Sequence, residues 1–193
     1  MNGAQKSAPP NKAHLAVSVG IPRTTAELDE VRKLLRSFIE WHRRRHTQDL
    51  RLIDAYFDAA AFAEELATLP GAYVPPRGQL LLATVEGAGA GCVALRAIDG
   101  ESCEMKRMFV YEHLHGRGVG QALATAIIDQ ARNLGFQRML LDTSIRQNEA
   151  KRLYSRLGFE ITEPYYELPE EIRDWLVFMK LDLHPVNQGS TQP

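Results

Sequence analysis

Three things are scarce in this sequence of 193 residues: long apolar runs, an excess of one charge, and cysteine. Its longest apolar runs are four or five residues, such as 59–63 and 80–83, whereas a helix that spans a bilayer needs roughly 20. Lys and Arg number 23 and Asp and Glu 24, a formal charge of −1, so bulk charge does not suggest nucleic-acid binding. Two cysteines, Cys92 and Cys103, make no disulfide framework. We therefore expect a cytoplasmic protein without nucleic-acid or membrane partners.

The composition is that of an ordinary globular domain, with 45% apolar and 24% charged residues. Residues 1–13 and 184–193 are polar and contain proline, and we expect both to be disordered tails. Residues 1–12 also lack the apolar core of a signal peptide. One domain is expected over residues 14–183, which is long enough to bury a sizeable core without disulfides.

Between these tails, strand-like and helical apolar patterns alternate. They predict strands over 15–19, 79–85, 91–98, 102–110, 138–141 and 175–183. They predict helices from a cap at Thr24 or Thr25 through the basic residues 43–45, over 58–69, from the glycines near 118 to Gly135, and over 149–157. Asp99-Gly100 predicts a hairpin turn. This mixture indicates an α/β or α+β fold.

The most informative segment runs from a strand through a glycine loop into an amphipathic helix. Gly116, Gly118 and Gly120 expose the backbone where the chain enters that helix. The first N–H groups of a helix lack intrahelical acceptors and lie at the positive end of its dipole, so they can bind phosphate oxygens, with Arg117 as an added cation. Gly120-Gln121 excludes the Gly-Lys ending of a nucleoside-triphosphate loop, and the glycine spacing departs from the dinucleotide fingerprint. A glycine turn that only starts a helix is the other alternative.

The loop also resembles one known family. His115-x-x-Gly118-x-Gly120 is similar to the loop that holds the acyl-CoA pyrophosphate in the GNAT family of N-acetyltransferases, Gln/Arg-x-x-Gly-x-Gly/Ala. Two positions depart from the family pattern. His115 replaces Gln or Arg, and Gln147 stands where Asn is usual, with Asn148 one residue later.

Three other segments resemble this family in order and spacing. Residues 104–110 are similar to its central strand, and residues 138–142 to the strand that follows the loop and helix. Residues 153–159, Leu-Tyr-Ser-Arg-Leu-Gly-Phe, are similar to its late Leu-Tyr-x-x-x-Gly-Phe signature. Each motif is loose when taken singly, but together they are quite specific.

The resemblance implies a mixed, mostly antiparallel central sheet with flanking helices, in which the parallel strands 104–110 and 138–142 splay apart. It implies acetyl-CoA as co-substrate, a primary amine of a small molecule or peptide as acceptor, direct attack without a covalent enzyme intermediate, and no metal. The pantetheine arm would lie between the two strands, and a homodimer is a family-level expectation. The implied cofactor-binding residues are Met108, Phe109, Val110, His115, Gly116, Arg117, Gly118, Val119, Gly120, Gln121, Asn148 and Tyr154.

Glu104 is the candidate general base, because family members with a glutamate base on this strand carry it at this distance from the loop. A carboxylate partly buried on a sheet face can have a raised pKa and accept a proton directly or through water. The alternative is a structural ion pair with Lys106 or Arg96. Regular alternation would place Glu104, Lys106, Met108 and Val110 on one face of the strand.

Tyr154 matches the family tyrosine that protonates the departing thiolate as general acid. A phenol, with a pKa of about 10, is a usable donor at neutral pH. The alternative is an aromatic core residue beside Leu153 and Leu157.

Several other features have more than one interpretation. His113 and His115 form a His-x-His pair without a third ligand in register, so we expect no metal site. Residues 41–46, Trp-His-Arg-Arg-Arg-His, are typical of a solvated helix end, with a patch for an acidic partner as the alternative. Tyr165 and Tyr166 either line the mouth of the acceptor pocket or are surface aromatics. A non-catalytic acyl-CoA-binding module is the second hypothesis for the whole chain.

Overall fold

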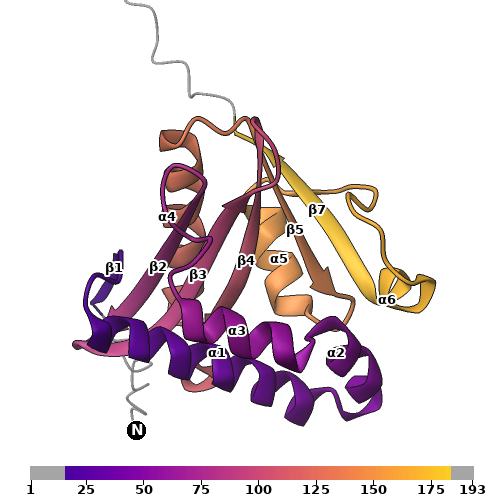
Figure 1. Ribbon diagram of the computed structural model, residues 1–193, viewed down its shortest axis with the longest axis horizontal. Coiled ribbons are helices and arrows are strands. Elements are labelled where there is room, and N and C mark those ends of the chain that lie inside the picture. The colour runs from indigo at the N-terminus through magenta and orange to yellow at the C-terminus, as the bar shows by residue number, and fades with distance from the viewer. Residues whose placement is uncertain (1–15, 184–193) are drawn as a thin grey trace, which may run out of the picture.

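The computed structural model describes residues 16–183, in which seven strands form one sheet in the order β1-β2-β3-β4-β5-β7-β6 (Figure 1). Only β4 and β5 pair in parallel in this part of the chain. The strands are β1 (Val17–Gly20), β2 (Gly78–Val85), β3 (Ala88–Ala97), β4 (Ser102–Val110), β5 (Arg138–Ser144), β6 (Glu160–Ile161) and β7 (Leu176–Asp182). The predicted mixed, mostly antiparallel sheet is confirmed.

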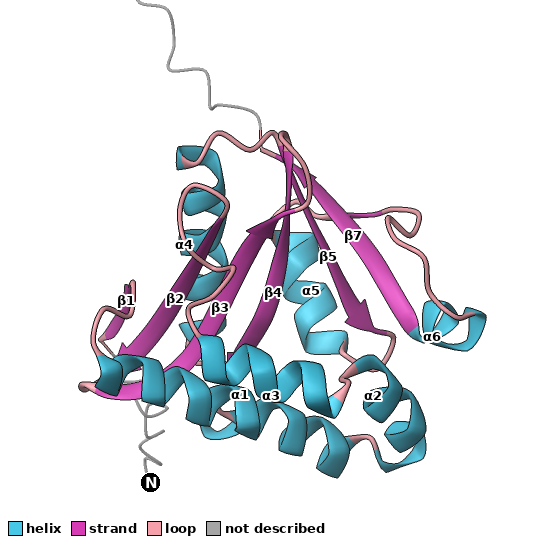
Figure 2. Cartoon of the chain, viewed as in Figure 1, coloured by secondary structure: helices cyan, strands magenta, loops and turns pink. Residues whose placement is uncertain are grey.

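Helices cover both faces of the sheet (Figure 2). The helices are α1 (Thr25–Arg45), α2 (Leu50–Tyr56), α3 (Ala59–Thr68), α4 (Val119–Asn133), α5 (Asn148–Arg156) and α6 (Glu170–Trp175), with short 3-10 turns η1 (Thr47–Asp49) and η2 (Glu112–Leu114). In Figures 1 and 2, α1 and α3 lie in front of the sheet and α4 and α5 behind it. The chain therefore has three layers and two principal cores.

The first long helix, α1, begins where the sequence predicts. The Thr24 side chain accepts a hydrogen bond from the Glu27 backbone, and the Glu27 carboxylate accepts one from the Thr24 backbone, which is a complete capping box. Val31, Leu34 and Leu35 recur at helical spacing and are fully buried against β2, β3 and β4. This apolar stripe fixes which face of α1 is turned toward the sheet.

The two parallel strands separate soon after they begin. Residues 102–104 of β4 pair with residues 138–140 of β5, and the pairing ends there. Beyond Glu104 the strands diverge, as Figure 1 shows, so the edge of β4 from Met105 to Val110 has no partner strand on the β5 side. The predicted splay is present, and it leaves backbone hydrogen-bonding groups of β4 facing an opening.

A β-bulge interrupts β4 beside this opening. Two residues, Arg107 and Met108, lie opposite a single residue of β3, Val93. Arg107 has a φ of +57°, a left-handed conformation that is uncommon for any residue other than glycine. Such an extra residue turns all the following side chains to the opposite face of the sheet.

The bulge makes the predicted alternation wrong beyond Lys106. Met108 and Val110 pack with Met105 on the α4 side of the sheet, whereas Phe109 packs on the α1 side. Glu104 and Lys106 therefore do not share a face with Met108 and Val110. A bulge at a charged residue leaves no signal in the apolar pattern, so the sequence could not indicate it.

Short elements account for the other differences from the sequence-based expectations. The helices α2 and α6 and the strand β6 were not predicted, because helices of about two turns or fewer and a strand of two residues are too short to show an apolar period. The last strand begins at Leu176 rather than at Trp175, because Trp175 ends α6. The expected tails, 1–13 and 184–193, lie outside the described residues.

Candidate active site

A cavity of about 680 Å³ lies where β4 and β5 diverge, between the glycine loop and α5. Most of the predicted cofactor-binding residues line it: Met108, Phe109, Val110, His115, Gly116, Gly118, Gly120, Gln121 and Tyr154. Three predicted residues, Arg117, Val119 and Asn148, do not line it. Segments that are up to 46 residues apart therefore meet at one opening.

The glycine loop has the geometry of an anion site. Gly116 and Gly118 have φ angles of +72° and +87°, which only glycine adopts without strain. Gly118 caps α4, and no side chain caps this end of the helix. The backbone N–H groups of Gly118, Val119, Gly120 and Gln121 have no backbone acceptor in the described chain. At the positive end of a 15-residue helix, these donors can hold phosphate oxygens.

Three arginines that were not predicted to bind the cofactor line the cavity. They are Arg45, Arg152 and Arg156, whereas the predicted cation Arg117 lies outside its lining. Arg152 and Arg156 are four residues apart on α5, a spacing that places them on one helical face. This spacing is the feature of the sequence that could have indicated these two cations. Val119 can contribute only its backbone N–H, because its side chain is buried in the core.

His115 connects the loop to the end of β4. Its ring Nε2 lies 2.9 Å from the Val110 carbonyl oxygen, and its ring meets the Trp41 indole edge to face. At the start of α5, the Gln147 side chain is buried and contacts the ring of His42, whereas Asn148 is exposed. Gln147 therefore occupies the cavity wall position expected of Asn148.

Tyr154 forms part of the cavity wall and is otherwise buried, with 6% of its surface exposed. Burial, and secondarily the negative charge of Asp142, raises the pKa of this phenol above its usual value of 10. The hydroxyl therefore keeps its proton at neutral pH. The side chain also contacts Phe159 in the core. Tyr154 therefore packs in the core and lines the cavity at the same time.

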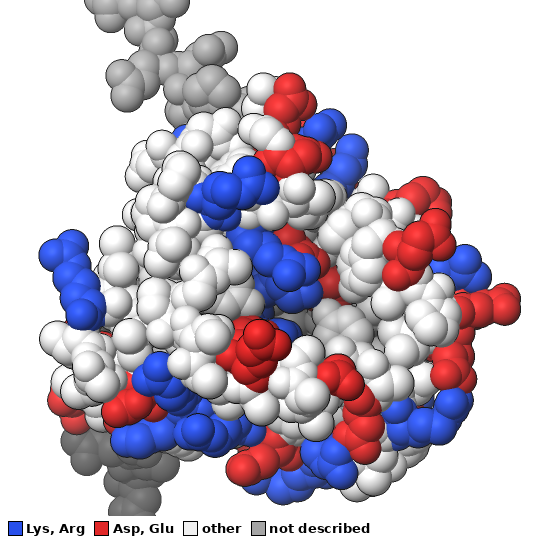
Figure 3. Space-filling model, in the orientation of Figure 1, with Lys and Arg blue, Asp and Glu red and all other residues white. Residues whose placement is uncertain are grey.

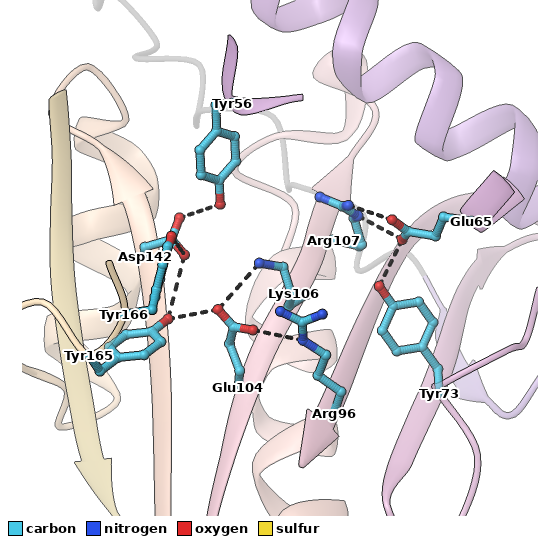
Figure 4. A network of polar contacts seen from close by, with 10 residues as sticks. All are labelled: Tyr56, Glu65, Tyr73, Arg96, Glu104, Lys106, Arg107, Asp142, Tyr165 and Tyr166. Atoms are coloured by element: carbon cyan, nitrogen blue, oxygen red, sulfur yellow. Dashed lines mark hydrogen bonds and ion pairs between the residues drawn. The ribbon is translucent and has the colours of Figure 1, made fainter. Parts of the chain in front are cut away.

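Glu104 is held in place by charged and polar partners (Figure 4). Its carboxylate accepts hydrogen bonds from Arg96 Nε at 2.9 Å, Lys106 Nζ at 3.3 Å and the Tyr165 hydroxyl at 2.9 Å. Burial raises the pKa of Glu104, but Lys106, Arg96 and the hydrogen bond from Tyr165 together outweigh it and lower the pKa from its usual value of 4.5. The expected raised pKa is therefore wrong, because both candidate ion-pair partners are engaged at once. The role of Glu104 as general base stays a prediction.

The strained residue of β4 is anchored from α3. Arg107 Nε donates to Glu65 Oε1 at 2.7 Å, and Glu65 also accepts a hydrogen bond from the Tyr73 hydroxyl. The guanidinium lies over the rings of Phe57 and Phe62, at 5.7 and 5.6 Å from their centroids. This buried pair offsets the cost of the left-handed backbone at Arg107 and so holds the bulge at the cavity.

The helix end over residues 41–46 is not simply solvated. Trp41, His42 and His46 are buried, and only the arginines between them are exposed. Burial, with a smaller effect from His46, lowers the pKa of His42 to about 4. His42 is therefore a neutral member of the cavity wall at neutral pH.

This shift predicts an acid-sensitive fold. Because the pKa of His42 is 6.5 when exposed and about 4 when folded, the unfolded chain binds the proton first. Stability is lost as the pH falls from about 6.5 to about 4, by about 2 kcal/mol at pH 5. We expect the Tm of the wild type to fall between pH 7 and pH 5, and to fall less in His42→Gln. His113→Gln is the control, because His113 is exposed, and its Tm should fall as much as that of the wild type. If its Tm falls as little as that of His42→Gln, the acid sensitivity does not come from His42.

An aspartate that the sequence did not single out as a site residue lies beside the opening. Asp142 of β5 accepts hydrogen bonds from the hydroxyls of Tyr56 and Tyr166, and the Tyr165 hydroxyl lies 3.5 Å from it (Figure 4). These four residues come from β5, α2 and the segment before α6. No sequence motif brings such distant segments together, although Tyr165 and Tyr166 were among the residues considered for an acceptor mouth.

Two other observations bear on the site. In residues 16–183, no group of three or more His, Cys, Asp or Glu side chains is placed to hold a metal ion, and no described helix could cross a membrane. Cys92 and Cys103 are buried free thiols, and burial raises the pKa of each to about 12. Neither is suited to act as a nucleophile, as the sequence indicates.

Residues 35–159 match the model of the Acetyltransferase (GNAT) family. The chain belongs to the GNAT family. The matched range includes α2, α3, the glycine loop and residues 153–159. The family that the loop motif resembles is thus confirmed, and the chain is an acetyltransferase.

Comparisons with individual acetyltransferases show the same relationship. The chain is 39% identical over 122 residues to an uncharacterized N-acetyltransferase of Schizosaccharomyces pombe, covering 62% of this chain and 73% of that protein. Its fold is similar to that of a GNAT acetyltransferase of Staphylococcus aureus, with a TM-score of 0.65 and 18% identity over 88% of this chain and 100% of the other. It is also similar to the PaiA N-acetyltransferase of Thermoplasma acidophilum in complex with coenzyme A, with a TM-score of 0.64 and 12% identity over 87% and 99% of the two chains.

Proposed function

We propose that this GNAT protein transfers the acetyl group of acetyl-CoA to a primary amine by direct attack. The observation that carries the proposal is the row of unpaired N–H groups from Gly118 to Gln121, at the edge of the same cavity as the open edge of β4. The loop would hold the pyrophosphate. The pantetheine would lie along the unpaired edge of β4, where a backbone N–H can polarise the thioester carbonyl.

The reaction needs few groups from the protein. The acceptor ammonium loses one proton, its nitrogen attacks the thioester carbon, and the carbon–sulfur bond breaks as the amide forms. The nitrogen loses a second proton in forming the amide. Tyr154 would donate a proton to the leaving thiolate and recover one from solvent. Its position in the cavity wall and its raised pKa, which keeps the hydroxyl protonated, support this role as general acid.

A free-thiol release assay tests the proposal. The purified protein is incubated with acetyl-CoA and an amine library, and release of the CoA thiol is followed with and without each amine. Calorimetry with coenzyme A measures binding separately. Amine-dependent thiol release together with binding supports the transferase. No binding heat at saturating coenzyme A would overturn the site, and binding without transfer to any amine would overturn the proposed activity.

Replacing Glu104 by Gln separates its two possible roles. Because the carboxylate is buried between Arg96 and Lys106, we expect Glu104→Gln to lose about 2 kcal/mol of stability. A purely structural ion pair predicts that kcat falls by less than about tenfold, with the acidic limb of its pH profile retained. A loss of about 100-fold in kcat together with the loss of that limb would identify Glu104 as the base.

A further inference from the structure

Asp142 is a carboxylate without a cationic partner in the described part of the chain. Its carboxylate accepts hydrogen bonds from Tyr56 and Tyr166, the latter at 3.0 Å, and no ion pair within residues 16–183 includes it. It lines the cavity at the diverging strands. A partly buried carboxylate whose side-chain hydrogen-bond donors are all phenols is a favourable place for a cation, because pairing would offset its lost hydration.

A positive charge is left over close by. Glu104 is a single carboxylate shared by two cations, Arg96 and Lys106. The third cation of the group, Arg107, is paired with Glu65. One positive charge is therefore unbalanced at the Arg96–Lys106 end of the network, just as one negative charge is unbalanced at Asp142 (Figure 4).

Both charges face space that a ligand could enter. Arg96 and Lys106 line a second cavity of about 640 Å³, together with Tyr165 and Tyr166. Tyr56, Lys106 and Arg107 line both cavities, so the two adjoin. In the space-filling view this side of the molecule is hollowed near its centre, with basic and acidic side chains at the rim (Figure 3).

One hydroxyl lies between Asp142 and Glu104, the carboxylate that pairs with both Arg96 and Lys106. Tyr165 donates to Glu104 at 2.9 Å and lies 3.5 Å from Asp142. A single small molecule could therefore reach both charges. An acceptor with only an ammonium group would satisfy Asp142 and leave the Arg96–Lys106 end unbalanced.

We propose that the acceptor is a small zwitterion of the amino acid class, with its ammonium group at Asp142 and its carboxylate at Arg96 and Lys106. This inference rests on the proposed function, because it names the acceptor of that same transfer. Lys106, which lines both cavities, is the residue that would connect the carboxylate site to the place where the amine meets the thioester.

Matched pairs of amines test the proposal. Each pair joins an amino acid with the amine left when its carboxyl group is removed, such as phenylalanine with 2-phenylethylamine, and a series from glycine to 6-aminohexanoate varies the charge separation. We expect the best amino acid to exceed its partner at least about tenfold in kcat/KM. Equal or faster transfer to the amines without a carboxylate would overturn this inference and leave the proposed function standing. Transfer to no amine at all would overturn both.

Variants locate the two charges. Lys106→Met keeps Glu104 paired with Arg96 and should reduce the amino acid-to-amine ratio of kcat/KM by about tenfold. Asp142→Asn removes the charge and keeps one of the two acceptor oxygens, while its NH2 group can donate to a phenol oxygen at the other position. It should raise the KM of every amine while leaving the Kd of coenzyme A unchanged. Arg132→Gln, which removes an exposed ion pair on α4, is the control and should change neither. If the amino acid-to-amine ratio of kcat/KM is unchanged in Lys106→Met, the proposed carboxylate site is wrong. If the KM of the amines is unchanged in Asp142→Asn, the proposed ammonium site is wrong.

Discussion

Gly120→Leu is expected to weaken the binding of coenzyme A by at least about 100-fold while the protein remains folded. A Cβ atom at Gly120 would lie 3.6 Å from Leu153 and 3.7 Å from Met108, which are ordinary contact distances. Leu153 and Met108 both line the cavity, so a longer side chain would extend into the space proposed for the pantetheine and pyrophosphate. Steric overlap of this kind costs about 3 kcal/mol, which is a factor of about 100 in Kd.

The measurement is calorimetric titration with coenzyme A, accompanied by thermal unfolding. Gly120 has no positive φ, so its replacement introduces no backbone strain and the Tm should stay close to that of the wild type. Gly20→Leu is the matched control, because a Cβ atom at Gly20 meets nothing within 4 Å. Wild-type affinity in Gly120→Leu would show that coenzyme A does not occupy this cavity.

Tyr154→Phe is expected to lower kcat by about 100-fold or more and to leave the Kd of acetyl-CoA nearly unchanged. A positioned general acid contributes about 10² to 10⁴ in rate, and the phenylalanine ring keeps the contact with Phe159. Because burial raises the pKa of Tyr154 above 10, the phenol of the wild type stays protonated up to at least pH 10. Loss of the Tyr154 proton should therefore cause no fall in activity below that pH.

Steady-state and single-turnover rates of Tyr154→Phe check this prediction. Single-turnover kinetics are needed, since slow product release would hide a loss in the chemical step. Tyr111→Phe is the control, because Tyr111 lies on the loop after β4 without lining the cavity. Full activity in Tyr154→Phe would assign this tyrosine to the core alone.

Local sequence was sufficient to predict the part of the candidate site that presents backbone N–H groups. The motif from His115 to Gly120 indicates a strand–loop–helix unit, and the structure shows the left-handed glycines and unpaired N–H groups that it implies. These properties follow from consecutive residues. The same holds for the capping box of α1, where Thr24 and Glu27 are three residues apart.

The acceptor side could not be predicted in this way. The bulge at Arg107 is stabilised by Glu65, 42 residues earlier in the chain, and it reverses the faces that alternation assigns to the rest of β4. The pKa of Glu104 depends on Arg96 and Lys106 acting together. Neither effect has a local signal, because each depends on which distant side chains share a buried space.

The order of the principal strands and helices, the glycine loop and the family could all be predicted from the sequence. These depend on apolar periodicity and on glycines at fixed spacing, which act over a few residues. Which charges remain unbalanced beside the opening depends on tertiary packing, because Tyr56, Asp142 and Tyr166 approach one another only after the sheet and its helices have packed. Electrostatic balance is a property of the folded neighbourhood, and for this reason the acceptor class that we propose has no signal in the sequence.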